Sequence, residues 1–407
     1  TFTGGRIFDG AQLLTAHAAR FQDGVLTALI SEREIAPDET VIDLGGDILA
    51  PGYVDLQVNG GGGVMFNDAP SVDNLTVIAK AHRSLGSVSL LPTLITDHAE
   101  KTTAAIAAVR HALRDNVAGI AGLHLEGPHL SVARKGAHDA ALIRPMDDAD
   151  LHRLLRAKDD IPVLKITVAP ENVTRDQVRQ LSRAGILVSL GHSDASFDTC
   201  CAYAEAGATC VTHLFNAMSQ LGNRAPGLVG AALNSGALSA GLIADTLHVH
   251  PATMRAAWAA KVGPGRIFLV TDAMAVAGSD QTEFTLGGRR ILRRDGTLTL
   301  PDGTLAGADL DLTRAIDVLV NTVGVALADA LCAATSVPAA LIGMPTGLRV
   351  GHTQRADLNR ISAALKPLPA LCGPFKGSRT PGFPGRCGQR ENTRAPAARR
   401  SKCRSHE

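Results

Sequence analysis

Three side chains of the kinds that bind zinc each follow a short apolar run of this 407-residue sequence. Glu126, His192 and His213 offer one carboxylate and two imidazoles, and such a set with an open fourth position is a known catalytic zinc arrangement. A metal held in this way lowers the pKa of a bound water towards neutrality. Each residue alone would be read as a hydrogen-bonded group at a strand end, but the three together favour a metal-dependent hydrolase. The motifs are His124-Leu125-Glu126-Gly127-Pro128, Gly191-His192-Ser193-Asp194 and His213-Leu214-Phe215-Asn216.

Asp272 has the chemistry of a general acid–base group. It follows the apolar run that contains Leu269 and Val270. A carboxylate at this place can take a proton from an activated water and return it to a leaving amine. On its own, an Asp here would be read as a cap for the segment that follows. Beside the metal set, we expect the acid–base role.

A second group of residues could contact a substrate. His138 and His248 lie beyond the third and seventh apolar runs, and Gln57 and Asn59 lie at the end of the first. Arg224 lies in a loop with glycine and proline, where its guanidinium could bind a phosphate. From the residues alone, a solvated surface arginine is an equally good interpretation of Arg224.

The ligand-capable residues share a position, because nearly all come just after a predicted strand. From about residue 49, short apolar runs alternate with longer helical stretches such as 71–85, 101–116 and 175–184, which is the pattern of βα units. Eight such strands predict an α/β fold, a closed (β/α)8 TIM-like barrel whose active site lies at the carboxyl ends of the strands. The expected strands are Ile48–Gln57, Val88–Ile95, Gly119–Leu125, Val163–Val168, Ile186–Leu190, Thr209–Thr212, Leu242–Ala244 and Ile267–Thr271.

Smaller segments flank and interrupt the predicted barrel. Residues 1–48 read as short strands punctuated by glycine, the first part of a small β module. The barrel is expected over residues 49–343, with a hairpin inserted at about 283–305. Residues 344–358 return to the module, so that N-terminal and C-terminal segments together build a small β-sandwich. From residue 359 Pro, Gly, Arg and Cys dominate. This composition predicts a tail over 359–407 that is disordered or that resembles translation in a shifted reading frame.

Composition and charge argue against several classes of protein. The net charge is +1 and 45% of the residues are hydrophobic, so no basic field points to nucleic acid as a partner. No apolar stretch is long enough to cross a bilayer, and residues 1–10 do not read as a signal peptide. Four cysteines within the predicted barrel show no metal-type pairing, which favours reduced thiols. These features predict a cytoplasmic enzyme with neither nucleic acid nor a membrane as a partner.

Several longer motifs together resemble one family, the N-acetylglucosamine-6-phosphate deacetylases of the amidohydrolase superfamily. The resemblance runs in order from about residue 4 to residue 358. Single motifs are not specific, but the set is. The motifs are Ala50-Pro51-Gly52-Tyr53-Val54-Asp55-Leu56-Gln57-Val58-Asn59-Gly60, Leu123-His124-Leu125-Glu126-Gly127-Pro128, Gly191-His192-Ser193-Asp194-Ala195, Thr212-His213-Leu214-Phe215-Asn216-Ala217-Met218, Pro226-Gly227-Leu228, Ile243-Ala244-Asp245-Thr246-Leu247-His248-Val249 and Leu269-Val270-Thr271-Asp272-Ala273.

The resemblance implies a specific site. Glu126, His192 and His213 would hold one divalent metal ion per subunit, zinc first and iron, cobalt or manganese as alternatives, with Asp272 as the acid–base residue. Many amidohydrolases carry His-X-His in the first strand for a second metal, whereas Gln57-Val58-Asn59 here is a form that the family associates with one metal. The implied substrate contacts are Ala137, His138, Asn216, Ala217, His248, Leu305, Ala306 and Gly307.

The resemblance also implies a partner and a reaction. The family's arginine at the position of Arg224 reaches the phosphate of a neighbouring subunit's substrate, which implies a homodimer. The expected reaction is hydrolysis of N-acetylglucosamine 6-phosphate to glucosamine 6-phosphate and acetate, in amino-sugar catabolism and recycling. The alternatives are another amidohydrolase reaction (a cyclic amidase, a nucleobase deaminase or another N-acyl deacetylase) and a non-catalytic relative that binds a phosphosugar.

Overall fold

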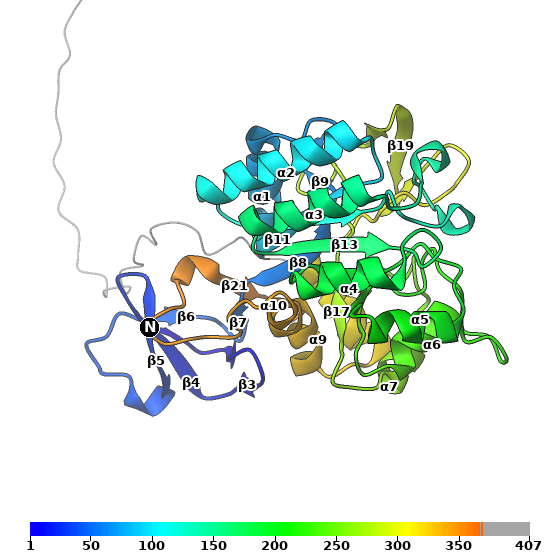
Figure 1. Ribbon diagram of the computed structural model, residues 1–407. Helices are drawn as coiled ribbons and strands as arrows, with labels where there is room; N and C mark the ends of the chain where they lie inside the picture. Colours follow the sequence, from blue (N-terminus) through cyan, green and yellow to red (C-terminus); the bar gives the residue numbers. More distant parts are fainter. Residues whose placement is uncertain (367, 369–407) are drawn as a thin grey trace, which may run out of the picture. The chain divides into compact units, whose positions relative to one another are not determined.

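Eight parallel strands form the wall of a barrel at the centre of the computed structural model, which describes residues 1–366 and 368 (Figure 1). Neighbours in this sheet follow chain order, as repeated βα units require. The sheet closes where Val58 pairs with Ala273 and the Asp272 amide donates to the Gln57 carbonyl at 3.0 Å. The predicted (β/α)8 fold is confirmed. The strands are β8 (Tyr53–Val58), β11 (Ser87–Ile95), β12 (Leu123–Glu126), β13 (Leu164–Val168), β14 (Leu187–Leu190), β15 (Cys210–Val211), β16 (Ser239–Leu242) and β17 (Ile267–Leu269).

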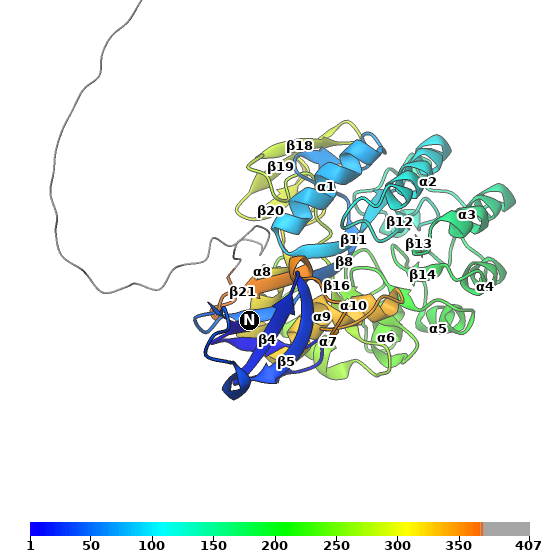
Figure 2. The same ribbon diagram turned by 90° about the vertical axis from the view of Figure 1, so that its left-hand side faces the viewer.

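Helices cover the outside of these strands, as the view in Figure 2 shows. Capping residues fix where several begin: the Ser71 side chain accepts from the Asn74 amide ahead of α1, and Thr174 and Gln177 form a capping box at α4. Leu75 on the inner face of α1 is buried in the main core. The helices are α1 (Val72–Ser84), α2 (Ala99–Arg114), α3 (Asp148–Asp160), α4 (Arg175–Arg183), α5 (Phe197–Glu205), α6 (Gly227–Asn234), α7 (Pro251–Ala260), α8 (Leu312–Asp317), α9 (Leu327–Ala334) and α10 (Ser336–Leu341).

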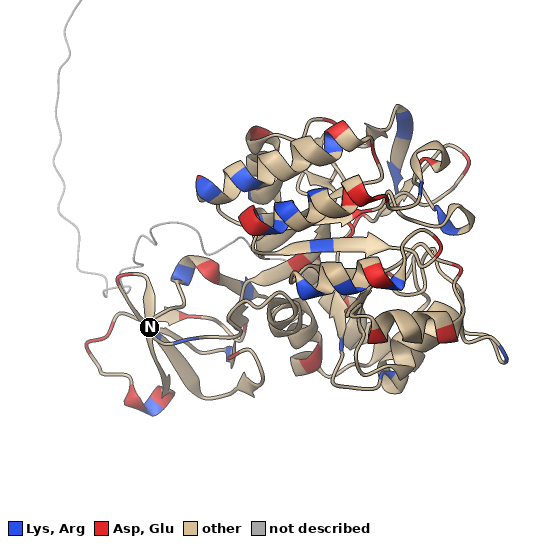
Figure 3. Cartoon of the chain, in the orientation of Figure 1, with Lys and Arg blue, Asp and Glu red and all other residues tan. Residues whose placement is uncertain are grey.

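The surface of the helices carries mixed charge. Lysine and arginine alternate with aspartate and glutamate along the outer helices, so that no single sign gathers on the face in Figure 3. Of the helices in the described ranges, none has both the length and the apolar character needed to span a membrane.

A small β module lies beside the barrel and consists of two four-stranded sheets, with strand orders β5-β4-β1-β6 and β21-β7-β2-β3. Phe2, Ile7, Leu26, Leu49 and Leu358 form a hydrophobic cluster that belongs to this module alone. The strands are β1 (Phe2–Thr3), β2 (Arg6–Phe8), β3 (Leu13–Leu14), β4 (His17–Gln22), β5 (Val25–Ser31), β6 (Ile42–Asp43), β7 (Ile48–Pro51) and β21 (Leu358–Ile361).

The predicted first strand, Ile48–Gln57, is wrong as a single element. The structure divides it into β7 of the module and β8 of the barrel, on either side of Gly52. A side chain at Gly52 would meet the Val88 side chain at 2.3 Å, and the Gly52 amide donates to the Asp357 carbonyl at 2.7 Å. Glycine therefore allows the backbone to approach β11 closely at the point where the chain changes sheet.

The predicted end of the module at residue 358 also needs correction. Strand β21 continues through Asn359 and Arg360 to Ile361 and pairs antiparallel with β7. The polar side chains that suggested a tail have partners there, since Arg360 donates to the Asp47 carboxylate at 2.6 Å and the Asn359 amide donates to the Gly86 carbonyl at 2.9 Å. The rest of the predicted tail, residue 367 and residues 369–407, lies outside the described residues.

The segment predicted as a hairpin at 283–305 has one strand more than expected. Strands β18 (Glu283–Leu286), β19 (Arg289–Arg294) and β20 (Thr297–Thr299) form an antiparallel sheet in that order. Its apolar side chains join a cluster with Ile95 and Met274 at the carboxyl end of the barrel. This sheet therefore covers one side of the barrel mouth.

A chain of buried hydrogen bonds crosses the barrel interior below that mouth. The ring of His124, on β12, contacts the Thr93 hydroxyl at 3.1 Å and the Thr167 hydroxyl at 2.7 Å. Thr212 continues the chain, with its hydroxyl 2.8 Å from that of Thr167 and 2.6 Å from that of Ser189. Because buried polar groups are costly without partners, this chain fixes the relative heights of the strands on which the site is built.

Asp55 lies at the seam where the barrel closes. Its carboxylate accepts from the Thr271 hydroxyl at 2.5 Å and from the Gln57 amide at 3.2 Å. Burial raises the pKa of Asp55 to about 7, against the lowering effect of these hydrogen bonds. The folded protein therefore holds a proton on Asp55 that the unfolded chain releases from about pH 4 upward.

We predict that Asp55 makes the protein less stable as the pH rises from about 4 to about 7, by up to about 1.4 kcal/mol per pH unit. An Asp55→Asn variant should show a flatter dependence in urea unfolding at pH 5, 6 and 7. Equal slopes for the two proteins would contradict the raised pKa, whatever the offset between the curves.

Candidate active site

A buried cavity of about 250 Å³ lies at the carboxyl ends of the barrel strands. This is the end at which barrel enzymes carry their active sites. The predicted site residues among its lining are Asn59, Glu126, Ala137, His138, His192, His213, Asn216, Ala217, His248, Asp272, Leu305 and Gly307.

Glu126, His192 and His213 come together at the bottom of this cavity although they lie on three different strand ends. One ligand atom from each lies within 4.8 Å of the other two, and all three side chains are buried. Glu126 Oε1 is 3.4 Å from His192 Nε2 and 3.2 Å from His213 Nε2. The two Nε2 atoms are 3.0 Å apart. This is the donor set that a divalent metal needs, from three protein ligands with room for a fourth.

The tautomer of His192 suits a metal ligand. Its Nδ1 is 2.9 Å from the Arg134 carbonyl, which can only accept, so Nδ1 carries the proton and the lone pair of Nε2 faces Glu126 and His213. Burial raises the pKa of Glu126, but the electrostatic effect of the two imidazoles that face it is larger and holds this pKa well below its usual range. The pKa of His213 is raised, because Glu126 outweighs burial, which lowers it. The set therefore attracts positive charge, which a metal would supply in place of a proton.

Asp272 lies beside this set and is held by two side-chain amides. Its Oδ1 accepts from Gln57 Nε2 at 3.1 Å and from Asn59 Nδ2 at 2.7 Å. The same Gln57 amide donates to Glu126 Oε1 at 3.1 Å. The Gln57 side-chain amide thus lies between the two carboxylates and donates to both. Burial first, and the charge of Glu126 next, raise the pKa of Asp272.

The backbone is strained at these residues. His192, His213 and Asp272 have φ of 48°, 28° and 52°, in the left-handed region that residues other than glycine rarely occupy. Each comes two or three residues after the end of its strand. Such strain persists only where the surrounding structure enforces it, and it is concentrated at functional sites.

Two further histidines line the cavity with defined tautomers. The Thr96 amide donates to His138 Nδ1 at 3.3 Å, and the Thr96 hydroxyl lies 2.7 Å from the same atom. His138 Nδ1 is therefore an acceptor and Nε2 carries the proton, 3.9 Å from Glu126 Oε2. Burial, and next His192, lower the pKa of His138 to about 3, so this ring is neutral at pH 7. His248 donates from Nδ1 to Asp245 at 2.6 Å.

Not every predicted site residue lines the cavity. Gln57 bonds to Glu126 and Asp272 from below, and Ala306 is fully buried with its amide bonded to the Leu298 carbonyl. Arg224 is exposed on its loop and does not border the cavity of its own chain.

The sequence interpretation missed several apolar or small residues of the lining. Ile95 is the last residue of a correctly predicted strand, and Met274 is two residues from Asp272, so position at a strand end was the available signal. The lining residues not predicted are Ile95, Gly136, Ile243, Met274 and Thr304.

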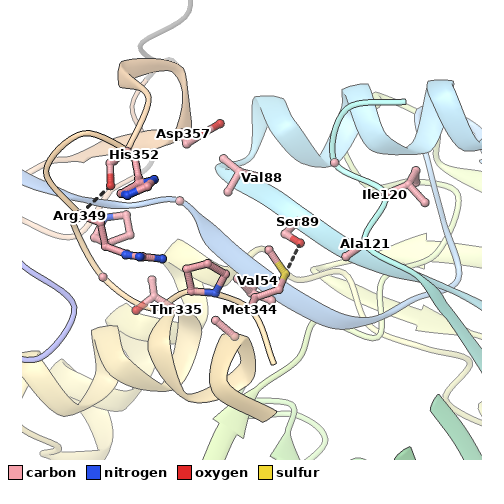
Figure 4. A pocket seen from close by; sticks show the side chains of 17 residues that line it. Val54, Val88, Ser89, Ile120, Ala121, Thr335, Met344, Arg349, His352 and Asp357 are labelled. Atoms are coloured by element: carbon pink, nitrogen blue, oxygen red, sulfur yellow. Dashed lines mark hydrogen bonds between the residues drawn. The ribbon is translucent and has the colours of Figure 1, made fainter. Parts of the chain in front are cut away.

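A larger pocket of about 590 Å³ lies at the opposite end of the barrel, between the starts of β8 and β11 and the segment that leads to β21 (Figure 4). Val54, Val88 and Ile120 form its apolar wall, and the Ser89 hydroxyl donates to the Met344 sulfur at 3.4 Å. None of the metal-ligand set or its neighbours reaches it. The smaller cavity is therefore the candidate active site.

We predict that Glu126→Gln lowers bound metal from about one ion per chain to well below that, because an amide is a much weaker ligand than a carboxylate. Metal content after gel filtration, measured by plasma mass spectrometry, checks this. His129→Gln is the matched control, a buried histidine three residues further on whose Nδ1 contacts the Arg144 carbonyl at 3.1 Å. Equal metal content in Glu126→Gln and wild type would show that Glu126 is not a ligand.

Comparison with known proteins agrees with this geometry. No family model matches the chain. It is 42% identical over 359 residues to the N-acetylgalactosamine-6-phosphate deacetylase of a Shewanella species, covering 86% of this chain and 90% of that protein. It is 33% identical over 359 residues to the N-acetylglucosamine-6-phosphate deacetylase of Haemophilus influenzae, covering 88% and 92%.

Solved structures of N-acetylglucosamine-6-phosphate deacetylases are also similar to this chain. The crystal structure of N-acetylglucosamine-6-phosphate deacetylase from Pasteurella multocida superimposes with a TM-score of 0.83 at 34% identity, covering 89% of this chain and 95% of that one. A mutant of the Mycobacterium smegmatis enzyme in complex with N-acetyl-D-glucosamine-6-phosphate gives a TM-score of 0.82 at 31% identity, with the same coverage of 89% and 95%. The chain belongs to the family of N-acetylglucosamine- and N-acetylgalactosamine-6-phosphate deacetylases, in the amidohydrolase superfamily.

Proposed function

We propose that this protein hydrolyses N-acetylglucosamine 6-phosphate to glucosamine 6-phosphate and acetate, in amino-sugar catabolism and recycling. The observation that supports this most is the buried set of Glu126, His192 and His213 next to Asp272, in a chain of this family. A non-catalytic phosphosugar-binding protein would have no use for a metal set and an oriented carboxylate together. The other amidohydrolase reactions have no comparable support from relatives.

Asp272 is the proposed acid–base residue. A divalent metal on Glu126, His192 and His213, zinc in our proposal, would polarise the acetamido carbonyl and lower the pKa of the attacking water. Gln57 and Asn59 both bond to Oδ1 of Asp272 and so fix the plane of the carboxylate. Asp272 accepts the proton of the water during attack and then donates it to the leaving amine.

His138 is the proposed donor to the carbonyl oxygen as negative charge develops on it. Its proton is on Nε2, because Thr96 donates to Nδ1, and Nε2 lies 3.9 Å from Glu126 Oε2 and so faces the metal set. A neutral imidazole that is held in place can stabilise an oxyanion without reorganisation at the moment of reaction. Burial lowers the pKa of His138 to about 3, which favours this neutral form at pH 7.

The sugar phosphate is proposed to lie towards the ends of β15 and β16. Asn216 and Ala217 follow β15 and His248 follows β16, and all three line the cavity. Arg224 comes after Asn216 and Ala217 in the sequence, but it is exposed and does not line the cavity of its own chain. We therefore propose a homodimer in which Arg224 of each subunit binds the phosphate in the other subunit's site. The Leu305–Gly307 turn would close the cavity from within its own subunit.

N-acetylgalactosamine 6-phosphate is a second candidate substrate. The 42% identity to the Shewanella protein that bears this name exceeds the 33% identity to the glucosamine enzyme of Haemophilus influenzae. The two sugars differ only in the configuration at one hydroxyl group, away from the amide. Comparison of kcat/KM for the two phosphosugars distinguishes them.

The proposed location is the cytoplasm. Its support is the free state of Cys200, Cys201, Cys210 and Cys332 in the described residues. A phosphorylated sugar as substrate fits the same compartment.

We predict that Asp272→Asn lowers kcat by about 100-fold to 10,000-fold, the range typical of a lost general base. Its metal content should stay at the wild-type value, because Asp272 is not one of the three ligands. Acetate release and metal analysis of the same sample check both points. Loss of metal in this variant would mean that Asp272 has been assigned to the wrong role.

The proposed exchange of Arg224 between subunits can be tested by complementation. Arg224→Ala should raise KM for the phosphosugar and leave the metal content unchanged. Subunits of Arg224→Ala mixed with subunits of Asp272→Asn should regain activity, because each hybrid dimer has one site with Asp272 from one chain and Arg224 from the other. Absence of any gain after verified subunit exchange would contradict the shared site.

A further inference from the structure

A second cavity of about 670 Å³ lies next to the candidate active site. The two cavities share Ile95, Ala137 and His138 in their walls. On its far side the second cavity is bordered by the β18–β19 turn, and the Arg289 guanidinium there donates to the Ala137 carbonyl. These shared residues thus separate the catalytic cavity from the second one, called the second chamber below, which is open to solvent where exposed residues such as Lys135, Asp139 and Gly288 line it.

The position of Ile95 in the barrel determines which part of the substrate it meets. In the closed eight-stranded sheet, β11, which ends at Ile95, is diametrically opposite β15, which leads to Asn216. The following argument rests on the proposed function, in which the sugar lies towards β15 and β16 and the amide carbonyl lies at the metal set. The acyl group, on the other side of that carbonyl, must then extend towards β11.

The surroundings of Ile95 suit an acyl group. Ile95 is 9% exposed and belongs to a hydrophobic cluster with Met274 and Ala306, against which Ala137 packs. Ile95 and Met274 both line the catalytic cavity and give it an apolar surface, and Ile95 is the one that lies opposite β15. A methyl group gains by leaving water for such a surface.

The backbone of Ile95 is held independently of its side chain. The Asn67 side chain accepts from the Ile95 amide at 3.1 Å and donates to the Ile95 carbonyl at 3.2 Å. The next residue, Thr96, positions His138 through its amide and its hydroxyl. A change of the side chain at position 95 should therefore alter the wall and leave His138 in place.

We propose that Ile95 is the residue that limits the length of the N-acyl group, by contacting the acetyl methyl and closing the catalytic cavity towards the second chamber. A shorter side chain at this position opens the wall, and the carbons of a propionyl or butyryl group can extend into the chamber. The inference assigns a specificity role to Ile95 and no part in the chemistry.

The test compares glucosamine 6-phosphate carrying N-acetyl, N-propionyl or N-butyryl groups. In Ile95→Ala, the ratio of kcat/KM for butyryl over acetyl should rise by about tenfold or more, because one or two methylene groups in an apolar pocket change discrimination by this order. Ile95→Val should give a smaller rise, seen first with the propionyl substrate. This second variant keeps the test open if Ile95→Ala does not fold.

Ile243→Ala is the matched control, since Ile243 also lines the catalytic cavity but follows β16 on the sugar side. It should leave the order of acyl preference unchanged. Suppose that the wild-type protein releases acetate and that both Ile95 variants fold with an unchanged acyl preference. This result would overturn the role of Ile95 and leave the proposed function standing. Absence of acyl release from every substrate by the wild-type protein would instead overturn the proposed function.

Discussion

The site depends on one constraint, a buried carboxylate and a partly buried one that share one side-chain amide. Glu126 and Asp272 come from different strands, and both accept from Gln57 Nε2. Carboxylates this close cannot both be ionised in a buried place without nearby donors and cations. The amides of Gln57 and Asn59, the two imidazoles and a divalent metal together supply this compensation. The closing seam between β8 and β17 is therefore a catalytic feature as well as a structural one.

The same requirement explains why the barrel interior is polar just below the site. The hydrogen-bond network through His124, Thr167, Thr212 and Ser189 links the strands that lead to Glu126, His192 and His213. A slip of one strand by one residue would turn its ligand away from the axis. Satisfied polar groups penalise such a slip more than an apolar core would, because each misplaced group would be left without a partner. Rigidity at the ligands thus comes from the layer beneath them.

Much of this could be predicted from the sequence because local pattern and chemistry coincide at strand ends. Apolar runs followed by Glu126, His192 or His213 predict both the strands and the candidate metal ligands, and the run before Asp272 predicts the acid–base residue. The division at Gly52 could not be predicted, since only the proximity of Val88 requires glycine there. The sequence predicts that the module ends at residue 358, before most of β21, because the partners of Asn359 and Arg360 lie far away in the sequence. Ile95 was missed because an apolar residue in a strand carries no chemical signal, and its role depends on a cavity formed by distant segments.

The most direct test of the account is acetate release by the purified protein from N-acetylglucosamine 6-phosphate and from the unphosphorylated sugar, before and after removal of metal with a chelator. The account predicts release largely confined to the phosphorylated sugar, loss of release with the metal, and recovery when zinc is added. About one metal per chain with no acetate from either sugar, or from N-acetylgalactosamine 6-phosphate, would contradict the proposed reaction and leave the barrel with its metal site.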